Sequence, residues 1–188
     1  MRTKRNQRQI ALFSLLLNAT LFTVSCKDEE VAVEEENELI TTVKLNFTSG
    51  GITQSFNYSD PDGDGGKAPT IDAISLKPNT TYTLTIEVLD ESKMPVGNIT
   101  DEIKKESDEH LFVYTPTPNS LLTYVYGDKD ANNFGIGITG STKTYTAGTG
   151  KLKVQLRHQP PINGKASKDG TPTPGSDDIN IDFNVTVQ

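Results

Sequence analysis

Three aspartates alternate in the segment SDPDGDGG, where Asp60, Asp62 and Asp64 precede Gly65. Alternate carboxylates on a tight turn that contains glycine can converge on a hard cation, as they do at the start of a calcium-binding loop. An EF-hand would close such a site with a glutamate six residues after the glycine, but Ile71 stands there. Two alternatives therefore stay open: a weak calcium site, or an acidic, solvated turn between strands.

The chain has two histidines, and each lies at the end of an expected strand. His110 follows Asp108 and Glu109 where one strand opens, and His158 closes another, in phase with its apolar residues. Imidazoles at strand ends can meet a carboxylate and bind a transition metal. The alternative is that each histidine caps the core and donates a hydrogen bond to a backbone carbonyl. A shared metal site of His110 and His158 is one hypothesis.

Sequence motifs for catalysis are weak or absent. Gly135, Gly137 and Gly140 in GIGITG have the spacing of a dinucleotide-binding loop, but the residues that follow do not begin a helix that could hold a pyrophosphate. Ser141 stands where a P-loop would need lysine. The sequence has no G-x-S-x-G elbow and no H-E-x-x-H pair. We therefore expect a glycine-rich strand and turn here, and a protein that is not an enzyme.

The elements that must position these residues are mostly strands. Apolar residues alternate with polar ones, the pattern of a strand buried on one face. The clearest segments are Val43–Phe47, Tyr82–Val88, Leu152–Leu156 and Ile179–Val187, and the shorter candidates are Ile52–Tyr58, Thr70–Leu76, Glu109–Thr115, Leu121–Tyr126 and Phe134–Thr139. Turn-forming clusters separate them. The pattern predicts an all-β fold, a single antiparallel β-sandwich of immunoglobulin-like kind.

Two segments break the strand pattern. Residues Ile99–Glu106 predict one or two turns of helix, in which Asn98 can cap the N-terminus and the first turn is acidic. The loop Gln159–Asp178 is long for a hairpin connection, which indicates that it is either mobile or functional.

The N-terminus predicts export and lipidation at the only cysteine of the chain, Cys26. Basic residues precede an apolar stretch, Ile10–Val24, that is too short for a confident membrane-spanning helix, so residues 1–25 are expected to be a signal peptide. Thr23, Val24 and Ser25 before Cys26 resemble the lipobox of bacterial lipoproteins, in which the thiol receives diacylglycerol. Several acyl chains on one residue hold a protein stably to a bilayer.

Acidic residues follow the cysteine and dominate the net charge of the mature chain. Lys27, Asp28, Glu29 and Glu30 resemble the export tag that directs Bacteroidota lipoproteins to the cell surface, and residues 26–38 predict a disordered acidic tether before a folded domain at 39–188.

Cleavage before Cys26 would change the formal charge from −7 to about −11 because four basic residues are lost. Such a chain lacks the basic surface that nucleic acids need, so no nucleic-acid partner is expected. With one cysteine, the domain depends on its apolar core rather than on a disulfide.

Five segments together resemble a group of small Bacteroidota lipoproteins: TTVKLNFT, FNYSDPDGDGGKAPT, NTTYTLTIEVLDES, NITDEIKKESDEHLFVYTP and LKVQLRHQP. Members of this group often carry the label of a type 1 periplasmic binding domain, and their genes lie in settings similar to those of partners of TonB-dependent receptors. The resemblance implies a binding role beside such a receptor. Both histidines and the three aspartates fall inside the matching segments.

These observations lead to a functional expectation. We expect an outer-membrane, surface-exposed lipoprotein whose sandwich is a non-catalytic binding module, accessory to TonB-dependent uptake of a nutrient or metal. The alternative is a structural or adhesive surface protein without a small ligand. The chain has no tryptophan to stack on a sugar ring, and most of its tyrosines are in phase with the core of the expected strands.

Overall fold

The computed structural model describes residues 39–63 and 66–188. This part of the chain consists of strands and one short helix, as the alternation predicted. The elements are β1 (Thr42–Ser49), β2 (Ile52–Ser59), β3 (Thr70–Ile71), β4 (Ile74–Leu76), β5 (Thr81–Asp90), β6 (Gly97–Asn98), α1 (Ile99–Lys105), β7 (His110–Thr117), β8 (Leu122–Tyr126), β9 (Thr139–Thr144), β10 (Gly148–His158) and β11 (Ser176–Val187). The all-β prediction is confirmed.

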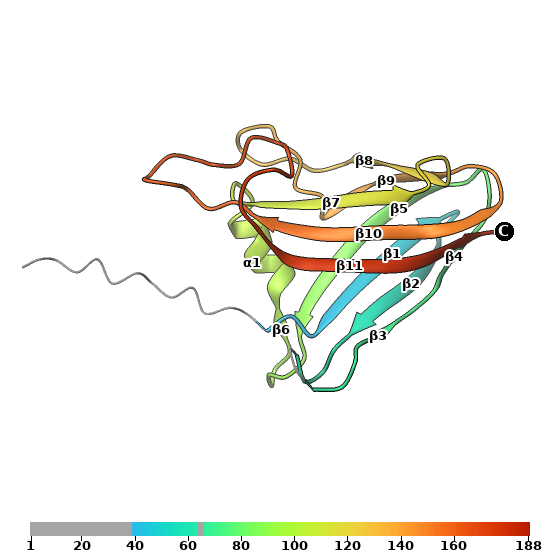
Figure 1. The fold of residues 1–188 in the computed structure, drawn as a ribbon, viewed down its shortest axis with the longest axis horizontal. Coiled ribbons are helices and arrows are strands. Elements are labelled where there is room, and N and C mark those ends of the chain that lie inside the picture. The colour runs from blue at the N-terminus through green and yellow to red at the C-terminus, as the bar shows by residue number, and fades with distance from the viewer. Residues whose placement is uncertain (1–38, 64–65) are drawn as a thin grey trace, which may run out of the picture. The chain divides into compact units, whose positions relative to one another are not determined.

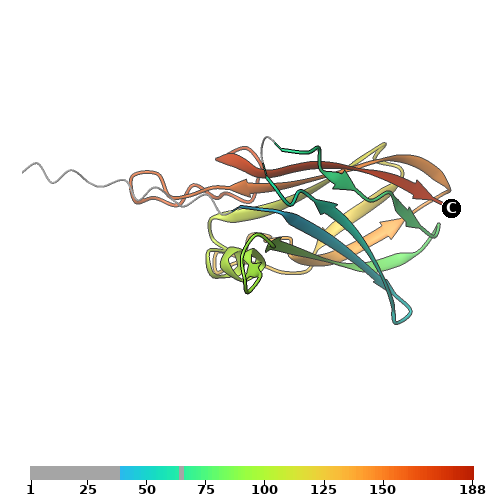
Figure 2. The ribbon, with the colours of Figure 1, turned by 90° about the horizontal axis from the view of Figure 1, so that it is seen from below.

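The strands form two layers. Sheet A has the order β3-β2-β1-β5-β9-β8, with β6 also paired to β5, and sheet B has the order β4-β11-β10-β7. Neighbouring strands are antiparallel except for the parallel pair β4 and β11. Figure 1 shows β10 and β11 crossing over the diagonal strands β1 and β5, and Figure 2 shows the same layers turned by 90°.

The core lies between the two layers because each strand turns its apolar residues inward. Phe47, Val154 and Phe183 have no exposed side-chain surface at all. The Phe47 ring packs edge to face against Phe56 and Tyr82, with ring centroids 6.0 Å apart in each case. Burial of such side chains contributes about 1.5–3 kcal/mol each, which allows the domain to do without a disulfide.

The β1–β2 hairpin ends in a two-residue turn that requires glycine. Gly50 and Gly51 have φ values of 58° and 78°, which fits a type I′ turn. The residues that flank the turn, Ser49 and Ile52, are paired directly. This turn fixes the register of β1 and β2 over their whole length.

The helix α1 packs on β5 through a buried threonine. The Thr100 Oγ1 accepts a hydrogen bond from the Val88 N–H at 2.7 Å and donates one to the Val88 carbonyl at 3.3 Å. The prediction that Asn98 caps the helix is wrong in its side-chain contact: Asn98 Nδ2 donates to the Asp101 carboxylate instead of capping a backbone N–H. The short polar side chain is satisfied within the first turn, so the hydroxyl of Thr100 anchors the helix.

Two strand predictions differ from the structure. Residues 134–138 form a loop, and the strand in this region is β9, which begins at Thr139. The segment Thr70–Leu76 is divided into β3, which pairs in sheet A, and β4, which pairs in sheet B. Short apolar runs do not reveal which residues find a partner strand, because pairing depends on distant residues.

The long loop after β10 is held to the body of the domain by a buried ion pair. The Lys168 Nζ lies 2.8 Å from Asp130 Oδ2 and also donates to the Ser107 carbonyl at 2.8 Å. The Gln159 side chain is fully buried and donates to the Thr171 and Pro174 carbonyls. These contacts fix the central part of a loop that the sequence indicated to be either mobile or functional.

Candidate functional site

The structure brings the two histidines together. His110 is the first residue of β7 and His158 the last of β10, and the antiparallel register places them directly opposite each other. Their rings stack with centroids 4.9 Å apart and an angle of 7° between the planes. Neither residue is prominently exposed: His110 is 7% exposed, and the side chain of His158 is 16% exposed.

Two carboxylates and one carbonyl surround the histidine pair. The His110 Nδ1 lies 3.0 Å from the Glu106 carbonyl oxygen, which can only accept, so Nδ1 carries the hydrogen. In the neutral ring, Nε2 then carries the lone pair, and it lies 4.0 Å from Asp178 Oδ2. On the other ring, His158 Nε2 lies 3.9 Å from Glu109 Oε2. We refer to His110, His158, Glu109 and Asp178 as the histidine cluster.

The histidine cluster has an acidic environment. Burial raises the pKa of the Glu109 carboxyl, and the nearby charges of Asp108 and Glu106 raise it further. The two histidines act in the opposite direction and lower it. An additional positive charge near Glu109 would therefore be favourable, because it would relieve the repulsion among these carboxylates.

The ends of three strands and the end of α1 position the cluster. The Gln159 N–H donates to the Glu109 carbonyl at 2.6 Å, which joins the chain just after β10 to the chain just before β7. Gly175, which precedes β11, has a φ of 77°, and a Cβ at this position would overlap the His158 carbonyl oxygen. Glycine is thus required where the start of β11 approaches the end of β10.

Two imidazoles and two carboxylates are a ligand set that suits zinc and other divalent transition metals. A metal binds in the plane of an imidazole, about 2.0–2.1 Å from its nitrogen. Because the two ring planes are nearly parallel, one ion cannot lie in both planes in the arrangement seen. Within residues 39–63 and 66–188, no three His, Cys, Asp or Glu side chains already converge on one point. Metal binding would require the rings to rotate toward each other.

Sequence reasoning named His110 and His158 but missed Asp178. Glu109 had a visible signal, since it is the neighbour of His110 in the sequence. Asp178 lies twenty residues beyond His158 in the acidic stretch that enters the last strand, and no local pattern separates it from Asp177. Asp177 instead pairs with Arg157, whose guanidinium lies 2.6 Å from its carboxylate.

The aspartate-rich segment is only partly described, because Asp64 lies outside the described residues. Asp60 is 7% exposed and accepts a hydrogen bond from the Tyr58 hydroxyl at 3.1 Å. Asp62 accepts from the Lys67 N–H at 2.9 Å, as in an ordinary turn. The Asp60 Oδ1 is buried and has no hydrogen-bond partner in the described part of the chain. Calcium binding at this segment stays a prediction.

The predicted signal peptide, the lipidation residue Cys26, the export tag Lys27–Glu30 and the acidic tether all lie outside the described residues. In the described part of the chain, no helix is both long and apolar enough to cross a membrane.

The glycines of GIGITG make room for tyrosine rings. A Cβ on Gly135 or Gly137 would contact the Tyr126 ring, and one on Gly140 would overlap the Tyr124 ring. Tyr124 lies between Tyr126 and Tyr114, with ring centroids 5.2 and 4.2 Å away, respectively. The motif therefore has a packing role in the structure.

A pocket of about 450 Å³ lies where α1 meets sheet A. On this edge of β5, β9 pairs as far as Thr85 and β6 begins to pair at Leu89, which leaves Ile86–Val88 without a strand partner. The Ile86 N–H donates to the Ile138 carbonyl instead, and α1 contacts Val88 through Thr100. The pocket occupies this gap in the sheet.

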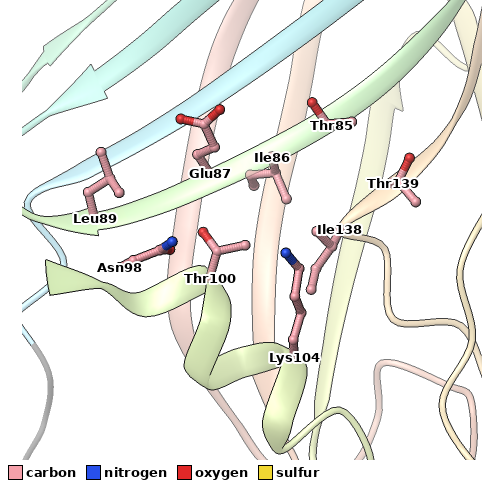
Figure 3. A pocket seen from close by; sticks show the side chains of 9 residues that line it. All are labelled: Thr85, Ile86, Glu87, Leu89, Asn98, Thr100, Lys104, Ile138 and Thr139. Atoms are coloured by element: carbon pink, nitrogen blue, oxygen red, sulfur yellow. The ribbon is translucent and has the colours of Figure 1, made fainter.

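The pocket combines an apolar base with polar groups from both sides. Ile86, Leu89 and Ile138 contribute aliphatic surface. Figure 3 shows Lys104 extending from α1 with its amine toward β5, where Glu87 lies on the opposite side. Convergent polar groups above an apolar base are typical of small-molecule sites.

No protein-family model, curated protein sequence or solved structure matches the chain. Functional inference therefore rests on the geometry of the histidine cluster and of the surfaces around it.

Proposed function

We propose that the protein is a surface-exposed outer-membrane lipoprotein whose sandwich is a non-catalytic module for binding a divalent transition metal. One observation carries the proposal: two histidines face each other across β7 and β10, each with a carboxylate about 4 Å from its Nε2. Three of these side chains come from β7, β10 and β11, and Glu109 directly precedes β7, so three segments that are far apart in the sequence meet here.

The chemistry of the histidine cluster favours zinc or a metal of similar preference. Imidazole nitrogens suit Zn²⁺, Cu²⁺ and Ni²⁺, and carboxylates complete such sites in many proteins. The Glu106 carbonyl supports this assignment because it holds the hydrogen on His110 Nδ1 and directs Nε2 toward Asp178. A hydrogen bond of this kind to the other ring nitrogen is the usual support of a metal-binding histidine. Rotation of the two rings out of their stack would bring both Nε2 atoms to one ion.

The proposed biological role is capture of the metal, or of a complex that contains it, for a TonB-dependent receptor. The resemblance to small Bacteroidota lipoproteins supports this partner, and the predicted lipid anchor on Cys26 would place the module at the same membrane. Affinity purification from native membranes, followed by identification of co-purifying proteins and metals, tests the role. Recovery of neither a receptor nor a metal would contradict it.

Titration of the purified metal-free protein with Zn²⁺ tests the site itself. We expect one ion per chain by calorimetry, and a loss of affinity of at least about tenfold in His158→Asn and in Asp178→Asn. Asp182→Asn is the control, because this residue is an exposed acid on the same strand as Asp178 whose carboxylate pairs with Lys151 and Lys153. Zinc should also raise the thermal stability of the wild type, since it binds the folded state. Equal affinities in the wild type and His158→Asn would refute the proposal.

A further inference from the structure

The outward face of sheet A carries short polar side chains in rows that cross its strands. One row crosses five strands and consists, in order, of Thr53, Thr48, Thr83, Ser141 and Val125. A second row crosses four strands and consists of Ser55, Asn46, Thr85 and Thr139. Neighbouring strands lie about 4.8 Å apart, so the polar members of each row set hydroxyl or amide groups at that interval, and the apolar Val125 ends the first row.

The two rows are uncharged. Next to them, the Lys44 Nζ lies 3.2 Å from Glu87 Oε2, so these opposite charges neutralise each other. At the other end of the face, Lys143 lies over the ring of Tyr145 at 5.6 Å from its centroid. The Tyr145 hydroxyl is within hydrogen-bond distance of Thr123, which is also an outward-facing residue. An aromatic ring that no sequence pattern places outside the core thus borders the hydroxyl rows.

The outward face of sheet B has a different chemistry. Long charged side chains cover it, and Lys151 and Lys153 both pair with Asp182, at 3.6 and 3.3 Å. Arg157 pairs with Asp177 on the same strands. Ion-paired side chains of this kind are ordinary for a solvated sheet face. The uncharged hydroxyl rows are therefore a property of sheet A and not of outward strand positions in general.

The hydroxyl rows lead into the pocket beside α1. Thr85 and Thr139 end the second row and also line the pocket (Figure 3). Neither of these hydroxyls has a hydrogen-bond partner elsewhere in the described part of the chain. The Lys104 amine, 3.5 Å from the Asp101 carboxylate and largely exposed, adds a donor to the same pocket. Hydrogen-bond donors and acceptors thus extend from the flat outward face of sheet A into the pocket beside α1.

We propose that this face of sheet A, together with the pocket, binds a neutral polysaccharide. On β1 and β2 the members of the rows already hydrogen-bond each other, Thr48 with Thr53 and Ser55 with Asn46. The hydroxyl groups of a sugar both donate and accept, which matches the remaining hydroxyls of the rows, on Thr83, Ser141, Thr85 and Thr139. The interval between strands is similar to the length of one sugar unit in an extended chain, so successive units meet successive strands. The pocket receives a chain end or branch, whose apolar ring face lies on the half-buried Leu89 while its hydroxyls meet Thr85 and Thr139.

Other occupants fit this face less well. Nucleic acid and acidic polymers need a row of cations, whereas the basic groups here are few and two of them are paired or placed over a ring. A protein partner usually needs buried aromatic or arginine anchors at the centre of the interface. The centre of this face has threonines, and the large apolar residue in its rows is Val125 at the edge. Of these possible occupants, a neutral, hydroxyl-rich chain that is recognised through hydrogen bonds fits this face best.

Native electrophoresis in gels that contain soluble polysaccharides tests the proposal with the full-length protein. The probes are mixed-linkage β-glucan, xylan and galactomannan as neutral chains, and alginate as an acidic one. We expect retardation by at least one neutral chain and none by alginate. Thr83→Lys, which places a long charge at the centre of the first row, should weaken the retardation constant by about tenfold.

Thr115→Lys is the matched control, because Thr115 is an exposed threonine opposite Lys153 on the outward face of sheet B. This variant has the same change in charge and should be retarded like the wild type. Absence of retardation by all three neutral chains overturns the proposal, as does an equal loss in both variants. A dimer in solution that Thr83→Lys dissociates also overturns it and assigns the face to a second copy of the chain.

Discussion

The ammonium of Lys168 and the carboxylate of Asp130 form an ion pair that is almost fully buried, with side-chain exposures of 1% and 0%. Burial alone would raise the pKa of Asp130, but the Lys168 ammonium and the N–H groups of Phe134 and Asn132 outweigh it, and the pKa lies below its ordinary value. This pair joins the long loop after β10 to the loop before β9. A single lysine in a polar loop gives no sequence signal of burial, so no prediction from the sequence could have included it.

Replacement of Lys168 by methionine should destabilise the domain by about 3–5 kcal/mol, because a buried carboxylate then loses its partner. The free energy of unfolding from urea titration measures this loss. Lys165→Met is the control, because Lys165 is an exposed lysine of the same loop and its replacement should cost little. Equal stabilities of the two variants would contradict the structural role of the pair.

Acid should weaken the domain through the same carboxylate. The pKa of Asp130 is lowered in the folded state, so its contribution to stability is complete above the unfolded value of about 3.9 and is lost as the pH falls through the folded value. We expect the free energy of unfolding of the wild type to fall between about pH 5 and pH 2. Asp130→Asn should show a shallower dependence over this range. Parallel curves for the two proteins would be inconsistent with the ion pair.

At the scale of elements, the junction of β10 and β11 depends on one glycine. Gly175 has a positive φ, and a Cβ there would overlap the His158 carbonyl oxygen. Gly164 also has a positive φ, 72°, but has open space around it. The two glycines lie in the same loop. Replacing each by alanine therefore distinguishes the energetic cost of a positive φ from the cost of the overlap with His158.

Gly175→Ala should therefore destabilise the domain by about 2–5 kcal/mol, the sum of an unfavourable φ and a forced shift of β10. Gly164→Ala should cost about 1–2 kcal/mol, since the backbone effect acts alone. Thermal unfolding of both variants checks the difference. If Gly164→Ala were as destabilising as Gly175→Ala, the contact with His158 would have no energetic weight.

Strands could be predicted from the sequence where buried and exposed residues alternate over many positions. They could not be predicted where the bounds of a strand depend on which distant residues pair with it. The segment Tyr82–Val88 alternates strictly and lies within β5. By contrast, Phe134–Thr139 contains apolar residues that fill the core from a loop, while β9 is mostly threonine, serine and lysine and was missed. The histidines were found because they are rare and in phase with strands, whereas Asp178 depends on a tertiary contact.

For the whole molecule, the predicted anchor would attach the proposed binding domain to a membrane. Cys26 follows the predicted signal peptide directly, and two or more acyl chains on one residue give stable anchoring. Cys26→Ala should therefore move the protein from the membrane fraction to the soluble fraction of lysed cells. The variant should keep its zinc affinity, because the histidine cluster lies in the folded domain. A variant that still sediments wholly with membranes would contradict lipid anchoring.

The proposed function depends most on closure of the histidine cluster around a metal ion. Anomalous diffraction at the zinc edge, from crystals of the protein grown with Zn²⁺, tests it most directly. We expect one strong peak, in the planes of both imidazoles and about 2.0–2.1 Å from the Nε2 atoms of His110 and His158, with Glu109 or Asp178 as a further ligand. Rings that remain stacked with no peak between them, or a peak only at the aspartates of the 60–64 segment, would contradict it.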